Sequence, residues 1–244
     1  MNIDPKTRLR SFLPVVFLTV ATFGLVTANS VQAGIILAEW NFENLPGGSA
    51  PTAVDADIVG SGVTASQLTK GAGVSQFYVR PDNGTPKRLR IQNAVGAIRE
   101  SDAIDFNIYG QFTLTAEAGK TLNLTTFEID AQSAGTNGRK YFVHYSTDGF
   151  ATSSTQLIAP TPVDNTLPNF NSANINLSGI NSITFRIYNF SDVDSDRPNR
   201  AVDYDYFRVN GAAVPEPSSL ALWGLGLGFA GFARRRRPQK PQNG

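Results

Sequence analysis

Short runs of alternating apolar and polar residues, each closed by turn-forming residues, recur through the middle of this chain and constrain its fold more than any other feature. Residues 127–130, 141–145 and 183–189 show the pattern most clearly. Apolar or aromatic side chains then share one face of an extended segment. No window of about 11 residues keeps the period of a helix. The pattern is typical of strands that bury one face against a second layer.

We expect about nine strands, because that many runs are bounded by Gly, Asn, Asp, Ser or Pro. The runs cover residues 35–42, 87–93, 103–109, 112–116, 122–131, 140–146, 156–158, 183–189 and 204–209. The first and last runs are expected to pair, and the Gly- and Ser-rich stretch 45–75 has room for short strands near 57–66. The sequence therefore predicts an all-β fold, a single antiparallel β-sandwich of the jelly-roll kind. An N-terminal signal helix and a single C-terminal hydrophobic helix would flank it.

The N-terminus has the three parts of a secretory signal peptide. Lys6, Arg8 and Arg10 precede an apolar run at 12–26, and small residues lead to Ala33. We expect signal peptidase to cleave after Ala33, so that residues 1–33 are removed. The alternative is an uncleaved membrane helix, but the run is shorter than the ~20 residues needed to span a bilayer.

The C-terminus joins a rigid polar segment to an apolar helix and a basic cluster. Pro215, Glu216 and Pro217 come first, and an apolar stretch predicts a membrane helix at about 219–233. Four arginines follow: Arg234, Arg235, Arg236 and Arg237. By the positive-inside rule this cluster stays on the cytoplasmic side, which places the β domain outside the inner membrane.

This arrangement resembles the PEP-CTERM sorting signal, whose pattern is Pro-Glu-Pro, a short hydrophobic helix and a terminal basic cluster. The resemblance implies that an exosortase processes the chain, with Pro215, Glu216 and Pro217 as the recognised residues. It also implies an inner-membrane-anchored intermediate and then delivery to the cell surface or extracellular matrix of a Gram-negative-type bacterium. The chain would thus comprise a signal peptide at 1–33, a β-sandwich domain at 34–213 and a sorting signal at 214–244.

Charge and cysteine content exclude several classes of function. The whole chain carries a formal charge of +1, yet residues 34–213 hold 13 Lys and Arg against 18 Asp and Glu. A mildly acidic domain disfavours nucleic acid as a partner, because phosphate binding needs a basic face. The chain has no cysteine, which excludes disulfides, thiolate zinc sites and cysteine nucleophiles.

An acidic loop is the candidate metal site. Asp192, Asp194 and Asp196 stand at alternate positions, and Asp203 and Asp205 could add ligands if the loop folds back. Calcium prefers such oxygen ligands, about 6–8 per ion. The helix-loop-helix calcium motif does not fit, because an arginine stands where that loop needs glycine. The alternative is a solvated acidic loop balanced by nearby arginines.

Tyrosines are the candidate ligand-binding residues. Sugar rings stack on exposed aromatic faces while nearby polar groups bond their hydroxyls, and Tyr109, Tyr141 and Tyr145 lie in the predicted strands. The alternative is that each is a half-buried sheet residue. Trp40, in the first run, is expected in the core.

The sequence contains no signature of catalysis. His144 is the only histidine, which rules out a multi-histidine zinc site, and no GxSxG nucleophile elbow occurs. The end strands and the closing Asp-Tyr-Asp-Tyr-Phe resemble jelly-roll modules of the carbohydrate-binding and galactose-binding-like kind. We therefore expect a non-enzymatic sandwich that binds or associates with exopolysaccharide. The alternatives are a matrix-acting hydrolase and a structural matrix protein without a specific ligand.

Overall fold

The computed structural model describes residues 35–81, 87–133, 138–163, 169–192 and 201–216. The predicted signal peptide, the predicted membrane helix and the arginine cluster lie outside these ranges. Within them, no helix is long and apolar enough to cross a membrane.

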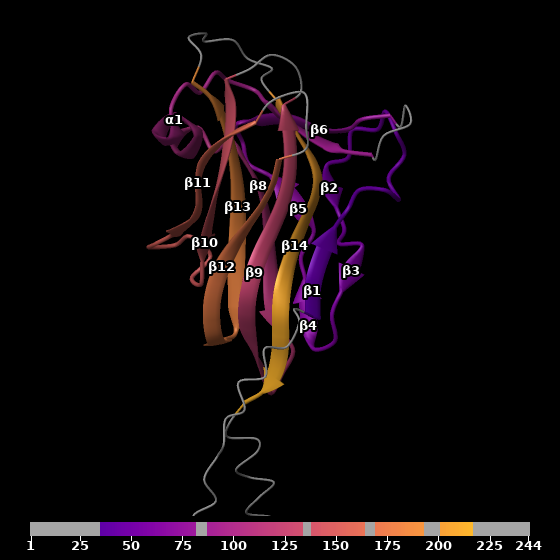
Figure 1. The fold of residues 1–244 in the computed structure, drawn as a ribbon, viewed down its shortest axis with the longest axis vertical. Helices are drawn as coiled ribbons and strands as arrows, with labels where there is room; N and C mark the ends of the chain where they lie inside the picture. The colour runs from indigo at the N-terminus through magenta and orange to yellow at the C-terminus, as the bar shows by residue number, and fades with distance from the viewer. Residues whose placement is uncertain (1–34, 82–86, 134–137, 164–168, 193–200, 217–244) are drawn as a thin grey trace, which may run out of the picture. The chain divides into compact units, whose positions relative to one another are not determined.

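Strand β14 (Ala201–Pro215) is the centre of the first sheet, here called sheet A (Figure 1). It pairs with β9 (Lys120–Ser133) on one side, and with β1 (Ile35–Trp40) and β7 (Leu89–Asn93) on the other. Three strands lie further out: β12 (Asn169–Ile180) on β9, β3 (Ile58–Val59) on β1 and β6 (Val74–Val79) on β7. Every pairing is antiparallel.

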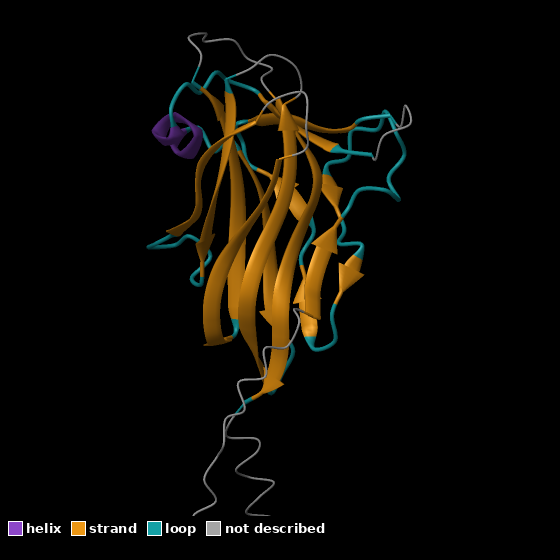
Figure 2. Cartoon of the chain, in the orientation of Figure 1, coloured by secondary structure: helices purple, strands orange, loops and turns teal. Residues whose placement is uncertain are grey.

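The second sheet, sheet B, lies behind sheet A in Figure 1. Its order is β11 (Thr155–Val163), β10 (Arg139–Ser146), β13 (Ser182–Ser191), β8 (Tyr109–Ala116), β5 (Leu68–Lys70) and β2 (Ala53–Val54), with β4 (Val63–Ala65) also on β8. All of its pairings are antiparallel too. The predicted all-β antiparallel sandwich is confirmed (Figure 2).

The pairing of the first and last strands is also confirmed, with Glu39 of β1 opposite Arg208 of β14. The strand predicted at 103–109 is wrong in its first half, where helix α1 (Glu100–Asp105) stands instead. Asp102 explains the helix, because its Oδ2 accepts the backbone N–H of Ile98 at 3.1 Å and of Arg99 at 3.0 Å. These bonds tie the two residues before the helix to its first turn, with Arg99 as the N-cap of a capping box.

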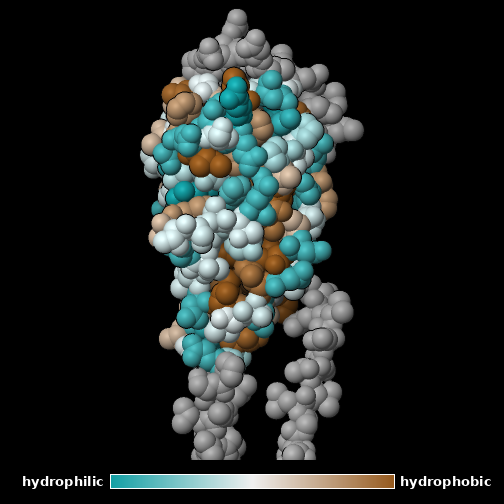
Figure 3. Space-filling model, turned by 90° about the vertical axis from the view of Figure 1, so that its left-hand side faces the viewer, coloured by the Kyte–Doolittle hydropathy of each residue, from teal (hydrophilic) through white to brown (hydrophobic). Residues whose placement is uncertain are grey.

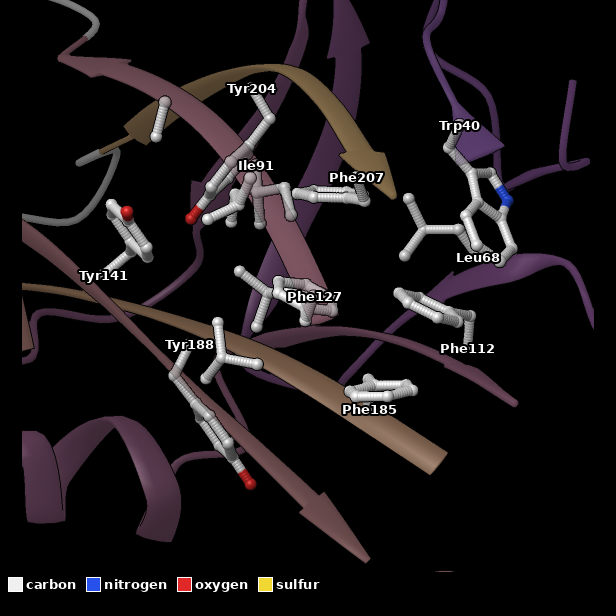
Figure 4. Close-up of a cluster of buried hydrophobic side chains, with 14 of the residues drawn as sticks. Trp40, Leu68, Ile91, Phe112, Phe127, Tyr141, Phe185, Tyr188, Tyr204 and Phe207 are labelled. Atoms are coloured by element: carbon white, nitrogen blue, oxygen red, sulfur yellow. The ribbon is translucent and has the colours of Figure 1, made fainter. Parts of the chain in front are cut away.

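Aromatic rings from both sheets fill the space between them (Figure 4). Phe185 of sheet B stacks on Phe127 of sheet A, and also on Phe112, with 5.2 Å between ring centroids in each pair. Trp40 lies 4.1 Å from Phe112 and is fully buried, as predicted. Each such side chain contributes roughly 1.5–3 kcal/mol by leaving water, so this core stabilises the packing of the two sheets in a chain without cysteine.

One hydrogen-bonded chain crosses this core. The Tyr204 hydroxyl of sheet A donates to Oδ1 of Asn189 in sheet B. The Asn189 Nδ2 donates back to the carbonyl oxygen of Ile91 in sheet A at 3.2 Å. Both side chains are buried, so the pair fixes the position of the sheets by satisfying polar groups that would otherwise be unpaired.

Candidate functional site

The outer face of sheet B carries a cluster of aromatic and polar side chains. Along β13 the side chains of Phe185 and Ile187 point into the core, so Arg186 and Tyr188 point outward. The strand register sets Arg186 between Gln111 of β8 and His144 of β10. Tyr188 lies between Tyr109 and Phe142 in the same way. The residues of this Arg186 cluster are Glu100, Tyr109, Gln111, His144, Phe150, Arg186 and Tyr188.

Arg186 is clamped between two aromatic rings. Its guanidinium carbon lies 4.3 Å from the ring centroid of Tyr109 and 4.0 Å from that of Phe150. Its Nε donates a 2.7 Å hydrogen bond to Oε1 of Gln111. Each cation–π contact is worth about 0.5–2 kcal/mol, and the clamp fixes the plane of the guanidinium group.

The turn between β10 and β11 delivers Phe150 to this position. Asp148 accepts the backbone N–H groups of Ala151 at 3.2 Å and Thr152 at 3.0 Å. The Ser146 hydroxyl accepts the Phe150 N–H at 3.0 Å, and Phe150 has a left-handed backbone with φ of 66°. Hydrogen bonds from Ser146 and then from Thr152 hold the pKa of Asp148 well below its ordinary value. The turn therefore keeps one shape, which seats the Phe150 ring over Arg186.

His144 connects the sheet to helix α1 and to the same turn. Its Nδ1 lies 3.2 Å from Ser154 Oγ, and its Nε2 lies 3.6 Å from Glu100 Oε1, which is longer than a hydrogen bond. Gln156 Nε2 donates to the same Glu100 oxygen at 2.7 Å. Burial lowers the pKa of His144, and the nearby charge of Glu100 opposes that shift.

Tyr188 supplies a hydroxyl at the centre of the cluster. Its ring stacks on Phe142 with centroids 4.7 Å apart and meets Tyr109 edge-on at 5.4 Å. Tyr188 is itself buried, with 2% of its surface exposed, and Figure 4 shows its hydroxyl pointing away from the other labelled rings. Burial raises the pKa of Tyr188, and hydrogen bonding and charge from Arg186 oppose the rise. The hydroxyl therefore stays neutral and can donate or accept at ordinary pH.

The outer face of sheet A is built from ion pairs instead. Arg208 contacts Glu39 at 2.6 Å and Glu128 at 3.2 Å. The fully buried carboxylate of Asp203 lies between Arg90, at 2.8 Å, and Arg80, at 3.0 Å. Here the charged side chains satisfy one another.

Two further carboxyl groups on sheet A have perturbed acidities. Burial raises the pKa of Asp130, with the charge of Asp205 adding to the shift. Burial also raises the pKa of Asp205, and Arg88 opposes that rise. One Asp130 oxygen is buried without a hydrogen-bond partner, which is why the fold disfavours its charged form.

The three predicted ligand-binding tyrosines fall in different places. Tyr109 lies in the Arg186 cluster. Tyr145 points inward, 6.4 Å from Phe185. Tyr141 needs a correction: none of its side chain is exposed, and it packs against Tyr204 at 6.2 Å. A ring in the core offers no face to a ligand in solvent.

The described acids of the predicted calcium site are engaged by cations. Asp192 pairs with Lys140 at 2.6 Å, and Asp205 lies 4.0 Å from Arg88. Asp203 is held by its two arginines, so calcium there would have to displace both. Within the described ranges no three His, Cys, Asp or Glu side chains form a group that could hold a metal ion. Asp194 and Asp196 lie outside those ranges, and calcium binding by them stays a prediction.

The start of the predicted sorting signal adjoins the sandwich. Pro215 is the last residue of β14 and pairs with Lys120, and the backbone N–H of Glu216 donates to the Gly119 carbonyl oxygen at 3.0 Å. Pro217 lies outside the described residues. The last strand therefore reaches the Pro-Glu-Pro segment itself.

Sequence reasoning missed most of the Arg186 cluster. The alternation at 183–189 contained the signal for Arg186, because it placed this residue on the polar face. No local pattern pointed to Glu100, Phe150 or Ser154, which reach the face from a helix and a turn.

Figure 3 views the side of the sandwich that lies at the left of Figure 1, where the end strands β11 and β12 meet. Apolar surface gathers there in a patch that hydrophilic residues surround. Pro160 and Pro162 lie in β11, and prolines are a common protection of a sheet edge against pairing with another chain.

Comparison with known proteins identifies the C-terminal segment. A family model described as the PEP-CTERM protein-sorting motif matches residues 213–237. The chain therefore carries this sorting motif, as expected, and the motif indicates an exported protein sorted by an exosortase. No curated protein matches the chain.

Among solved structures, carbohydrate-binding modules resemble the sandwich. The CBM22-1 xylan-binding domain of Xyn10C from Paenibacillus barcinonensis is 15% identical, with a TM-score of 0.38 over 73% of this chain and 96% of that domain. The family 11 carbohydrate-binding module of the cellulase Lic26A-Cel5E from Clostridium thermocellum is 10% identical, with a TM-score of 0.34 over 73% of this chain and 95% of that module.

Proposed function

We propose that the β-sandwich is a non-enzymatic module that binds polysaccharide through the Arg186 cluster. One observation carries the proposal: a guanidinium group held between the rings of Tyr109 and Phe150, beside the Gln111 amide and the imidazole of His144. Sugar rings combine apolar C–H faces with many hydroxyls. Aromatic faces beside convergent polar groups match both features.

The other face supports the choice by contrast. On sheet A the donors of Arg208 are used by Glu39 and Glu128. On sheet B the Arg186 guanidinium group contacts two rings and the Gln111 amide, and no described carboxylate pairs with it. A guanidinium group held in this way keeps N–H donors for the hydroxyl groups of a sugar.

The sorting motif supports a role outside the cell. Processing by exosortase would release the chain from an inner-membrane-anchored intermediate to the cell surface or extracellular matrix. The exopolysaccharide of the producing cell would then be the available ligand. The sandwich would attach the protein to that polymer.

Binding assays on the full chain, purified in mild detergent, test this function. We expect the chain to be retarded in native gels that contain an acidic or neutral bacterial exopolysaccharide. Tyr109→Ala and Phe150→Ala should each weaken binding by roughly 5- to 150-fold, if a sugar ring loses the roughly 1–3 kcal/mol that a nucleic-acid base gains by stacking on an aromatic side chain. Tyr206→Ala is the matched control, because Tyr206 packs beside Arg208 on sheet A at 5.0 Å.

Each variant must first show the far-UV circular dichroism and thermal unfolding of the parent chain. Loss of binding in Tyr206→Ala alone would move the binding face to sheet A. Retardation by no polysaccharide would contradict the proposal and leave a structural matrix role.

One set of contacts favours a second function, that of a matrix-acting hydrolase. Ser154 Oγ, the His144 imidazole and the Glu100 carboxylate follow one another at 3.2 Å and 3.6 Å. A hydroxyl, an imidazole and a carboxylate in that order can activate a serine nucleophile. The binding function is preferred, because the carboxylate lies beyond hydrogen-bond distance of the imidazole.

A fluorophosphonate probe, which labels activated serines, separates the two functions. A hydrolase should be labelled at Ser154, with labelling abolished in Ser154→Ala and His144→Gln and retained in the exposed control Ser66→Ala. We expect no labelling above that of Ser154→Ala. Stoichiometric labelling of the parent chain would instead support the hydrolase.

A further inference from the structure

Arg186 differs from the described arginines of sheet A in its partners. Around sheet A, the described residues Arg80, Arg88, Arg90 and Arg208 each lie within 4.0 Å of a carboxylate. Within the described ranges Arg186 has no such carboxylate, and its contacts are two rings, the Gln111 amide and the Tyr188 hydroxyl. Its positive charge is therefore held in place without a counter-ion.

The two acids described around this cluster, Glu100 and Asp148, do not pair with this charge. Glu100 lies against His144 and accepts from Gln156, and it forms no ion pair with Arg186. The Asp148 carboxylate accepts hydrogen bonds within its own turn, from the Ser146 hydroxyl and from the backbone N–H groups of Ala151 and Thr152. The guanidinium group thus keeps donors that no described carboxylate uses.

A planar guanidinium group with free terminal N–H donors is suited to bidentate recognition of a carboxylate. The ring clamp has already fixed its orientation, so less rotamer freedom is lost on binding. Neutral sugars need no such cation. A uronic acid presents a carboxylate on the same ring whose C–H face would stack on an aromatic side chain.

We infer that Arg186 binds the carboxylate of an acidic sugar, so that the ligand of this face is a uronate-containing polysaccharide. The inference rests on the proposed function, since it names the substrate class of the same site. The net negative charge of the domain gives a polyanion no non-specific attraction, so binding of an acidic polymer would depend on Arg186 itself.

The test compares acidic polymers with their neutral forms. Polygalacturonate, alginate and hyaluronate are titrated into the full chain in detergent, each beside a carboxyl-reduced preparation of the same polymer. We expect at least one uronate polymer to bind at least tenfold more tightly than its reduced form. Arg186→Gln should remove that preference, and Arg186→Lys, which keeps the charge but not the fork, should retain only part of it.

Arg208→Gln on sheet A is the matched control and should leave the preference unchanged. Equal binding of acidic and reduced polymers, lost in Tyr109→Ala, would overturn this inference while the proposed function stands. Equally tight binding of dextran sulfate would overturn it in favour of a general anion site. Binding of no polymer, acidic or neutral, would overturn both proposals.

Discussion

Two arginines at the middle of neighbouring sheets show how differently the outer faces of the sandwich are built. Arg208 on sheet A lies between the carboxylates of Glu39 and Glu128. Arg186 on sheet B lies between the rings of Tyr109 and Phe150. Cross-strand neighbours therefore decide the role of an outward side chain. On sheet A the carboxylates use the N–H donors of Arg208. On sheet B the two rings hold Arg186 without a carboxylate, which leaves N–H donors of its guanidinium group for a ligand.

The sharpest test of this contrast removes the buried acid of sheet A. Asp203→Ala should lower the free energy of unfolding by about 2–3 kcal/mol, because it leaves Arg90 and Arg80 beside an empty site. The estimate is below the usual range for a broken buried pair, since both arginines reach solvent. Urea unfolding followed by circular dichroism measures the change.

The matched substitution on sheet B should behave in the opposite way. Arg186→Gln should lower the free energy of unfolding by only about 1–2 kcal/mol, because it removes two cation–π contacts worth about 0.5–1 kcal/mol each, while it alters ligand binding. If Asp203→Ala proves neutral and Arg186→Gln strongly destabilises, the assignment of a structural face and a binding face is reversed.

An effect of similar size is expected where the two sheets are joined. Tyr204→Phe keeps the ring but removes the hydroxyl that bonds Asn189, so a buried amide oxygen loses its partner. The expected loss is about 1–3 kcal/mol in the free energy of unfolding. In the Tyr204→Phe variant, Asn189→Ala should then lower the free energy of unfolding by less than it does in the parent chain. A double-mutant cycle measures this coupling between the two residues. Additive losses would show that the bond does not join the sheets.

The sequence predicted the strands whose alternation is regular, and the reason is physical. In β13 the buried Ile183, Phe185 and Ile187 recur at every second position. Strand β12 was not predicted, because its few apolar residues are separated by many Asn and Ser residues and no regular alternation can be recognised. A left-handed residue at Asn176, with φ of 51°, also shifts the period within that strand.

The same limit explains which site residues were found. In residues 141–145 every position is apolar or aromatic except His144, so the pattern cannot say which alternate set faces inward. The structure buries Tyr141 and Val143, whereas Tyr109 on β8 faces outward. Phe150 and Glu100 reach the face through a turn and a helix, and no periodicity within a strand encodes such contacts.

The smallest expected effect concerns pH, and its sign should differ between the two faces. Asp130 and Asp205 on sheet A have pKa values raised above 3.8 by burial. Their contribution to stability is therefore complete below that value and is lost as the pH rises through the folded pKa. His144 on sheet B has a pKa lowered from 6.5 by burial. Its contribution is complete above 6.5 and is lost as the pH falls through the folded value.

Urea unfolding at a series of pH values from about 3.5 to 8 separates these contributions. Because the chain has one histidine, His144→Gln should flatten the part of the curve that lies just below pH 6.5. Asp130→Asn should flatten the part just above pH 3.8 and leave the histidine region unchanged. A parent chain whose stability falls as the pH rises through 6.5 would contradict the burial of a neutral imidazole on sheet B. The two faces differ in this respect because burial disfavours the charged form of each group: a protonated imidazole on sheet B and an ionised carboxylate on sheet A.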